Sequence, residues 1–257
     1  MIPRPDLENL QSNGTKLQSI RLHAAPRRSN QSVVDPNFSL ARLRLDQNEP
    51  FVEPEGNLQW SYRIAKRALD IVGAIVAIVL LSPLLASVFI VLCFTTRGRP
   101  LFRQERIGYL GRRFGMYKFR SMRLDAEKTQ HLVANKHTGP IFKNRRDPRI
   151  TRIGRILRRT SIDEMPQLFN VLLGHMSLVG PRPPLAKEVA KYKAWQRRRL
   201  AIQPGLTCLW QVSGRSEIGF DEWVRMDIWY LQNQNLRNDL RLLVRTPLCV
   251  LSCRGAY

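Results

Sequence analysis

The sequence predicts an α+β protein: a mostly helical cytoplasmic domain with a small β-hairpin, attached to a membrane by a kinked re-entrant helix and by amphipathic helices. Three observations lead to this prediction. An uncharged apolar segment occupies residues 71–94, and a glycine-containing stretch of alternating character follows it at residues 101–121. Most of the remaining chain shows the spacing of apolar residues that is typical of helices.

Composition divides the 257 residues into three parts. Residues 1–57 are rich in Asn, Gln, Ser, Pro and Arg without a sustained period, so we expect a disordered polar head. Residues 58–99 hold the apolar segment and its interfacial anchors, and residues 100–257 are long enough for one globular domain.

The charge balance points to anionic partners. The chain has 42 Lys and Arg against 20 Asp and Glu, a net charge of +22, which favours nucleic acid, anionic lipid or a phosphorylated substrate. Four scattered cysteines form no CxxC pair, so neither a zinc site nor a disulfide framework is indicated.

The apolar segment is long enough to cross a membrane, since about 24 residues in a helix span roughly 36 Å. Ser82 and Pro83 stand at its midpoint, where proline removes a backbone donor and predicts a break in the helix. The serine hydroxyl can bond the carbonyl that proline leaves without a donor. Basic residues at 66, 67, 97 and 99 flank both ends and favour a hairpin with both ends on the cytoplasmic side. From these residues alone, a single bent crossing is an equal alternative.

The domain after residue 100 is predicted from turns, caps and periodicity. A hairpin is expected with strands near residues 101–107 and 114–121. Asp147 as N-cap, with Pro148 after it, predicts a helix that ends near Arg159, and the capping box Ser161 to Glu164 predicts another. The helix that this capping box predicts covers residues 161–173. Further helices are expected at residues 123–135, 185–200 and 220–232, and an amphipathic, membrane-surface helix at 236–252.

The strongest candidate for chemistry is the pair Asp163 and Glu164. It stands at a predicted helix start directly after an arginine cluster, a position that suits phosphate groups. One carboxylate there can attack phosphorus or help to hold a metal ion, and the other can share the metal or move a proton. The alternative is purely structural, because a capping box also requires Glu at this place. Arg182 lies between two prolines that would preorganise it for an anion, and its alternative is a solvated loop residue.

Several long motifs occur in order along the chain. They are KRALD at 66–70, the apolar segment with Ser82-Pro83, YKFRSM at 117–122, DPRITRIGRILRRTSIDEMPQLFNVL at 147–172, SLVGPRPP at 177–184 and QPGLTCLWQVSGR at 203–215. Together they resemble the bacterial sugar transferase family, the monotopic polyprenyl-phosphate hexose-1-phosphate transferases. The resemblance covers about residue 62 to the C-terminus, and the polar head has no counterpart in it.

The resemblance implies an enzyme on the cytoplasmic face of the bacterial inner membrane. It would move a hexose-1-phosphate from a UDP-sugar to undecaprenyl phosphate with release of UMP, and so initiate synthesis of an exopolysaccharide, capsule or O-antigen. Carried onto this chain, it makes Asp163 the nucleophile that forms an aspartyl-phosphosugar intermediate, with Glu164 and Mg²⁺ at the same centre. The phosphate-binding residues that it implies are Arg158, Arg182, Lys118 and Arg120. It also makes Ser82-Pro83 the break of a re-entrant helix.

Two other classes of function are weighed against this one. A membrane-tethered nucleic-acid-binding protein would use the positive charge, but no RNP, KH or helix-turn-helix signature is present, so we expect no nucleic acid partner. A scaffold without chemistry would leave the carboxylate pair without a task. The expected partners are therefore the UDP-sugar, undecaprenyl phosphate and anionic inner-membrane lipids, with a homo-oligomer left open. The residues do not identify the sugar.

Overall fold

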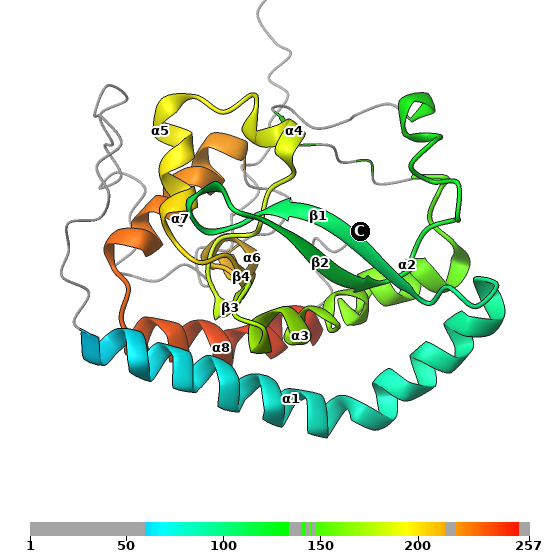
Figure 1. Ribbon diagram of the computed structural model, residues 1–257, viewed down its shortest axis with the longest axis horizontal. Coiled ribbons are helices and arrows are strands. Elements are labelled where there is room, and N and C mark those ends of the chain that lie inside the picture. Colours follow the sequence, from blue (N-terminus) through cyan, green and yellow to red (C-terminus); the bar gives the residue numbers. More distant parts are fainter. Residues whose placement is uncertain (1–59, 134–139, 142–143, 145–146, 214–218, 252–257) are drawn as a thin grey trace, which may run out of the picture. The chain divides into compact units, whose positions relative to one another are not determined.

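The computed structural model describes residues 60–133, 140, 141, 144, 147–213 and 219–251 (Figure 1). The predicted polar head lies outside the described residues. Eight α-helices and four strands are described, together with short 3₁₀ turns. They are α1 Trp60–Thr95, β1 Leu101–Ile107, β2 Arg113–Phe119, α2 Arg152–Arg159, α3 Gln167–Leu172, β3 Ser177–Val179, α4 Ala186–Val189, α5 Ala194–Arg197, β4 Gly205–Thr207, α6 Leu209–Ser213, α7 Phe220–Gln232 and α8 Leu236–Leu251.

Helix α1 is continuous through Pro83 and curves along its length (Figure 1). The helix is therefore not interrupted at Pro83, and its predicted re-entrant path stays a prediction. The predicted role of the serine is confirmed: Ser82 Oγ donates to the carbonyl of Val79 at 2.8 Å. This carbonyl lies four residues before the proline and is the one that lacks a backbone donor. The hydroxyl thus supplies the missing hydrogen bond and lets the helix continue.

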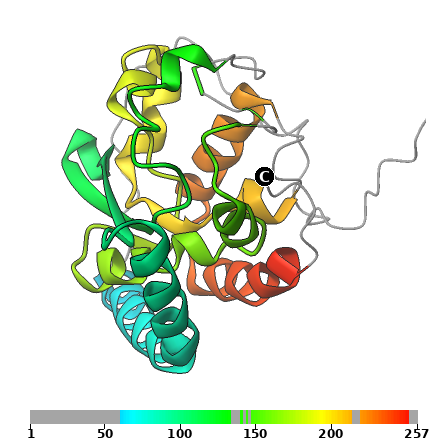
Figure 2. The same ribbon diagram turned by 90° about the vertical axis from the view of Figure 1, so that its right-hand side faces the viewer.

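Helix α1 is apolar and largely exposed. Its most apolar window has a mean hydropathy of 2.9 and is 6% buried, and among the described helices it alone is long and apolar enough to cross a membrane. Its first half contacts α3, β3 and α8. Arg67 joins it to the end of α3 by donating to the carbonyls of Val171 and Leu172 at 2.7 and 2.8 Å. Figure 2 shows α1 and α8 side by side on the same face of this part of the chain.

The predicted hairpin is confirmed. Strands β1 and β2 are antiparallel and pair Leu101 with Phe119 and Ile107 with Arg113. The buried side chain of Asn170 on α3 extends this pattern, because it accepts from the backbone N–H of Tyr117 at 2.9 Å and donates to the carbonyl of Gly115 at 2.8 Å. One amide side chain thus takes the place of a neighbouring strand and joins the hairpin to α3.

Strands β3 and β4 form a two-stranded parallel sheet that the sequence analysis did not predict. Each strand has three residues, too few for a period to be seen. Directly after β3, the backbone at Gly180 and that at Gly205 lie in close contact. A Cβ atom on Gly205 would lie 2.0 Å from the backbone nitrogen of Gly180, so neither position has room for a side chain.

The main core is rich in aromatic residues from the C-terminal helices, including Trp195, Trp210 and Trp223. The predicted helices at residues 220–232 and 236–252 are confirmed as α7 and α8. Asp239 of α8 is fully buried, where it accepts from Tyr62 and Tyr230 and pairs with Lys66 of α1 at 3.2 Å. Because the lysine and both hydroxyls converge on one carboxylate, the first turns of α1 are tied to the core.

Four predicted helices differ from the structure. The stretch 123–133 consists of turns, and the helix expected at 185–200 is divided into α4, α5 and a 3₁₀ turn. Helix α2 begins after Thr151, whose hydroxyl accepts from the backbone N–H of Gly154, whereas Asp147 pairs with Arg149 at 2.7 Å. The capping box at 161–164 is also wrong: Ser161 is left-handed, with φ of 58°, and caps nothing.

Candidate active site

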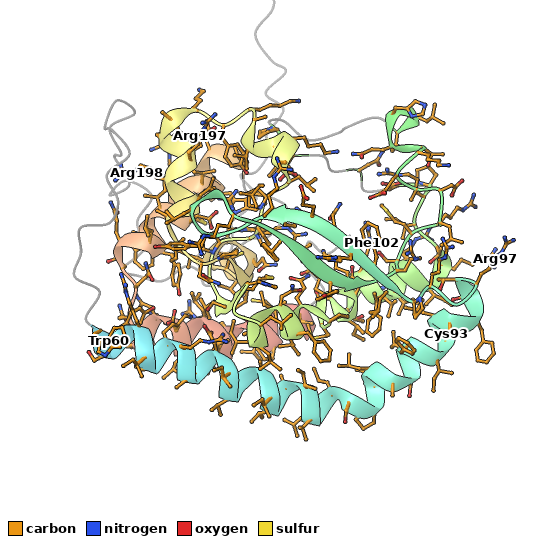
Figure 3. All side chains as sticks on the ribbon, in the orientation of Figure 1. Trp60, Cys93, Arg97, Phe102, Arg197 and Arg198 are labelled. Atoms are coloured by element: carbon orange, nitrogen blue, oxygen red, sulfur yellow. The ribbon has the colours of Figure 1, made fainter. Side chains whose placement is uncertain are left out.

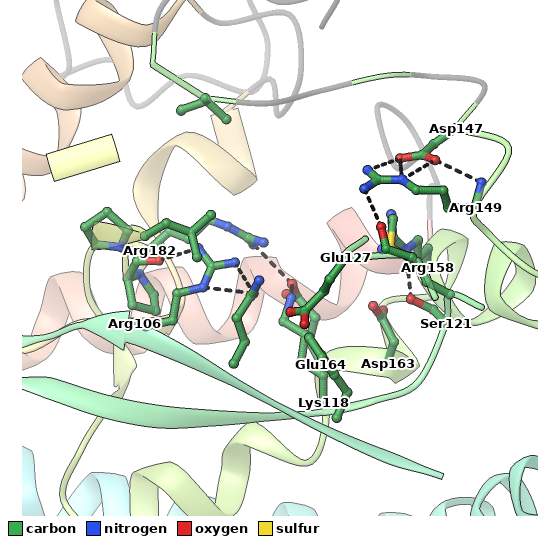
Figure 4. Close-up of a pocket in the computed structure, with 18 of the residues that line it drawn as sticks. Arg106, Lys118, Ser121, Glu127, Asp147, Arg149, Arg158, Asp163, Glu164 and Arg182 are labelled. Carbon is green, nitrogen blue, oxygen red and sulfur yellow. Dashed lines mark hydrogen bonds and ion pairs between the residues drawn. The ribbon is translucent and has the colours of Figure 1, made fainter. Parts of the chain in front are cut away.

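A cavity of about 430 Å³ lies between the hairpin, the 3₁₀ turn Ile162–Glu164, the loop after β3 and the helices α6 and α7 (Figure 4). Asp163 and Glu164 lie on its floor. Cationic side chains from four separate stretches of chain line it around them: Arg106, Lys118, Arg158 and Arg182. The folded chain therefore brings together three of the four predicted phosphate-binding residues with both predicted carboxylates.

Glu164 is held by two cations. Its Oε1 accepts from Lys118 Nζ at 2.7 Å and from Arg182 Nη1 at 3.1 Å. Burial opposes the ionisation of Glu164, but Lys118 and Arg182 outweigh it and hold the pKa of Glu164 well below its usual value. This carboxylate is therefore a fixed negative charge that orients Lys118 and Arg182 at the floor of the cavity.

Asp163 has a different environment although it is the next residue. The residue is 6% exposed, and within the described part of the chain no hydrogen bond or ion pair engages its carboxylate. Burial raises the pKa of Asp163, and the charge of Lys118 works against that shift. A buried carboxylate without a direct partner, beside cations that favour its ionised form, can act as a nucleophile.

Arg158 reaches the cavity from the last turn of α2. Its Nε donates to Ser121 Oγ at 2.9 Å, and burial lowers the pKa of the guanidinium. The backbone carbonyl of Ser121 accepts from the N–H of Thr151, at the start of the same helix, at 3.1 Å. Both ends of α2 are thus joined to Ser121, which fixes the direction of Arg158.

Arg106 was not identified from the sequence. It is 8% exposed and donates from Nη1 to the carbonyl of Pro183 at 3.0 Å, so it holds the loop that carries Arg182. Asn170 was also missed, although it places β2 and hence Lys118. The alternation of the hairpin marks the strand positions, but it does not distinguish a buried arginine from a solvated one.

Arg120 does not join the cluster around Asp163. Its guanidinium donates to the carbonyls of Arg99 and Leu101 and lies 5.4 Å from the ring centre of Phe102, at the edge of the cavity. Ser82 and Pro83 belong to α1 and are not among the residues that line the cavity.

The carboxylates define where a metal could be held. The described residues contain no group of three His, Cys, Asp or Glu side chains that could hold a metal ion by themselves. Mg²⁺ however needs only one or two carboxylates when phosphate oxygens and water complete its shell. The unengaged oxygens of Asp163, with Glu164 beside them, fit that mode of binding.

The family model described as "Bacterial sugar transferase" matches residues 61–253. The chain belongs to this family. The resemblance inferred from the sequence motifs is therefore confirmed. The match includes α1 except its first residue, the hairpin and every residue of the cavity named above.

Three curated relatives illustrate the similarity. The galactosyl transferase CpsE of Streptococcus agalactiae is 48% identical over 202 residues, which are 77% of this chain and 44% of that protein. The undecaprenyl-phosphate galactose phosphotransferase of Salmonella typhimurium is 42% identical over 207 residues, 77% of this chain and 42% of that protein. The exopolysaccharide production protein ExoY of Rhizobium meliloti is 36% identical over 221 residues, 82% of this chain and 96% of that protein. The chain thus spans less than half the length of the first two relatives.

Proposed function

We propose that this sugar transferase moves a hexose-1-phosphate from a UDP-sugar to undecaprenyl phosphate, releases UMP, and so initiates synthesis of an exopolysaccharide, capsule or O-antigen. One observation carries the proposal: the unengaged, buried carboxylate of Asp163 lies on the floor of a cavity lined by cations. The names of the relatives, which include an undecaprenyl-phosphate galactose phosphotransferase, agree with this reaction.

In the first half of the reaction, a carboxylate oxygen of Asp163 attacks the phosphorus that carries the sugar. The bond from that phosphorus to the bridging oxygen breaks, the oxygen leaves with UMP, and an aspartyl-phosphosugar remains. Lys118, Arg158 and Arg182 stabilise the charge on the phosphate oxygens. Because Glu164 orients two of these cations, it acts in the same step without touching the phosphorus.

In the second half, an oxygen of undecaprenyl phosphate attacks the phosphorus of the intermediate. The bond to Asp163 breaks, the carboxylate is restored, and the sugar leaves on the lipid as a diphosphate. The same cations serve both halves, because each half transfers one phosphoryl group between two anions. Asp163 and Glu164 would hold Mg²⁺, which supplies further charge neutralisation at the phosphates when it is bound.

The proposal extends to the membrane. The largely exposed apolar surface of α1 and the exposed apolar residues of α8, Leu240, Val244 and Leu248, favour contact with lipid. We place both ends of α1 on the cytoplasmic face of the inner membrane, near anionic lipids, because basic residues flank both ends. Single cysteines at Arg63→Cys and Arg99→Cys, in a background without other cysteines, test this topology. Both should resist a membrane-impermeant reagent added from outside, and labelling of only one would show a full crossing.

The assay for the reaction is UMP release from a panel of UDP-sugars, beginning with UDP-galactose, in the presence of Mg²⁺ and a polyprenyl phosphate. Asp163→Asn should abolish UMP release while the protein level and membrane fraction stay normal. Glu222→Gln removes a carboxylate from α7, away from the cavity lining, and is the matched control that should keep activity. Full activity of Asp163→Asn would refute the proposal. Mass spectrometry after incubation with donor alone should show a phosphosugar on the peptide that contains Asp163.

A further inference from the structure

Arg199 is a fully buried arginine that the proposed reaction does not use. It stands in the 3₁₀ turn Arg198–Ala201, its residue is 2% exposed, and its Nη2 lies 2.6 Å from Asp227 Oδ2 of α7. The same side chain donates from Nη1 to Tyr192 OH at 3.0 Å and lies 5.3 Å from the ring centre of Trp223. A charge buried this deeply needs both its ionic partner and its hydrogen bonds, so its direction is fixed.

The remaining contact of Arg199 leads to the active site. Its Nη2 also donates to the backbone carbonyl of Arg182 at 3.0 Å. The next carbonyl, that of Pro183, accepts from Arg106 at 3.0 Å. Two consecutive carbonyls of this loop are therefore each held by a buried arginine. The side chain of Arg182 leaves the backbone directly before the first of these carbonyls and extends to Glu164 (Figure 4).

We propose that Arg199 is a positioning residue, which acts on the reaction through the backbone of Arg182. This proposal rests on the proposed function, because it assumes that Arg182 binds a phosphate of the donor. Two alternatives are distinct from it. Arg199 lines the inner wall of the cavity and could touch the substrate itself, or its pair with Asp227 could serve stability alone.

The choice of variant separates these roles. Arg199→Ala would leave Asp227 as an uncompensated buried charge and would test only folding. Arg199→Lys keeps the positive charge for Asp227, but one ammonium group cannot reproduce the fork that reaches Asp227, Tyr192 and the carbonyl of Arg182 together. Arg197→Lys, at an exposed neighbouring position, makes the same change without these contacts and is the matched control.

The test is a double-mutant cycle with Arg182→Ala, measured as UMP release in intact membranes. Arg199→Lys alone should lower kcat/KM by about tenfold, the size expected for one lost hydrogen bond to a charged group. In the Arg182→Ala background the same change should cost less than about twofold, because the residue through which it acts is already gone. Losses that multiply in the double variant would overturn the proposal, since Arg199 would then act independently of Arg182.

Two further measurements keep the proposal falsifiable. If Arg199→Lys does not fold, Tyr192→Phe removes the hydroxyl that orients Arg199 and should show the same dependence on Arg182. The affinity for inorganic pyrophosphate is measured for the wild type, the two single variants and the double variant. Arg199→Lys should weaken this binding only when Arg182 is present, and the measurement does not need turnover. If the pyrophosphate affinities are coupled but the wild-type protein releases no UMP, the proposed function is refuted and the role of Arg199 is kept. Normal UMP release without coupling would refute only the role of Arg199.

Discussion

Replacing Glu164 by Gln tests the electrostatics of the site directly. The change removes the negative charge that Lys118 and Arg182 share, and it leaves both cations facing one another. The side chains of Lys118 and Glu164 are 14% and 16% exposed and meet at 2.7 Å, so this is a nearly buried pair. Breaking such a pair costs about 3–5 kcal/mol. Arg182, whose side chain is 31% exposed, adds little because solvent screens it.

The glutamine oxygen can still accept one hydrogen bond, so we expect the loss to lie at the lower end, about 3 kcal/mol. For a chain of this size that corresponds to a fall in Tm of about 6–12 °C, measured by thermal unfolding in detergent or nanodiscs at neutral pH. The pKa of Glu164 is lower in the folded than in the unfolded protein. Its contribution is therefore present above its usual pKa of 4.5 and is lost as the pH falls toward the folded pKa.

The gap in Tm between wild type and Glu164→Gln should accordingly stay constant from pH 6 to 8 and narrow below about pH 4.5. An equal Tm for the two proteins at pH 7 would refute the reasoning, because the carboxylate would then not be serving as the shared counter-charge. A gap that widens on acidification would refute it as well, since the sign of the pKa shift would be wrong.

The remaining predictions concern Asp163 and the close packing of α2. Asp163→Asn should raise Tm at pH 7 by about 2–4 °C, because a neutral amide removes the cost of an ionised, unengaged buried carboxylate. The pKa of Asp163 is raised in the folded protein, so the free-energy cost of its ionisation in the folded state develops as the pH rises. The gain in Tm of the variant should therefore vanish below the usual pKa of 3.8. A lower Tm for Asp163→Asn at pH 7 would contradict this prediction. Gly154→Ala should cost about 1–3 kcal/mol in the free energy of unfolding, because its Cβ would lie 1.9 Å from the carbonyl oxygen of Ser121. Gly154→Ala should also lower UMP release, because it displaces Arg158. An alanine variant with wild-type stability and activity would show that Gly154 and the carbonyl of Ser121 do not pack this closely.

Much of the fold is predictable where a pattern repeats. The apolar run of α1, the hairpin and the helices α7 and α8 each extend over enough residues for period and turn signals to agree. The helix starts at 147 and 161 were mispredicted for different reasons. Asp147 accepts from the backbone N–H of Arg149 at 3.0 Å, as a cap would, but it also pairs with the guanidinium of that residue, and α2 begins only after Thr151. Glu164 stands at a position that suits a cap, but it bonds Lys118, 46 residues earlier in the chain, instead. A local capping pattern cannot show that a cation distant in sequence will compete for the carboxylate.

The residues of the site also divide into those that local motifs predict and those that depend on contacts distant in sequence. The carboxylate pair and the basic side chains of Lys118, Arg158 and Arg182 stand in motifs, and the structure brings them to one cavity. Arg106 lies outside the quoted motifs, and Asn170 lies within the motif at 147–172 without any local sign of what it binds. The roles of both residues depend on backbone groups more than 50 residues away. The different environments of Asp163 and Glu164 likewise cannot be predicted from the sequence. Of these two neighbours, only Glu164 accepts hydrogen bonds from Lys118 and Arg182 in the described part of the chain.

The contact between Gly180 and Gly205 bears on how Arg182 is positioned in this chain. The loop that presents Arg182 starts where two stretches of main chain touch without any side chain between them. The position of this loop at the cavity wall is therefore set by contact between peptide groups, whose dimensions are the same in every protein. A β-carbon at either glycine would push these two stretches of main chain apart and would displace the guanidinium of Arg182 with them.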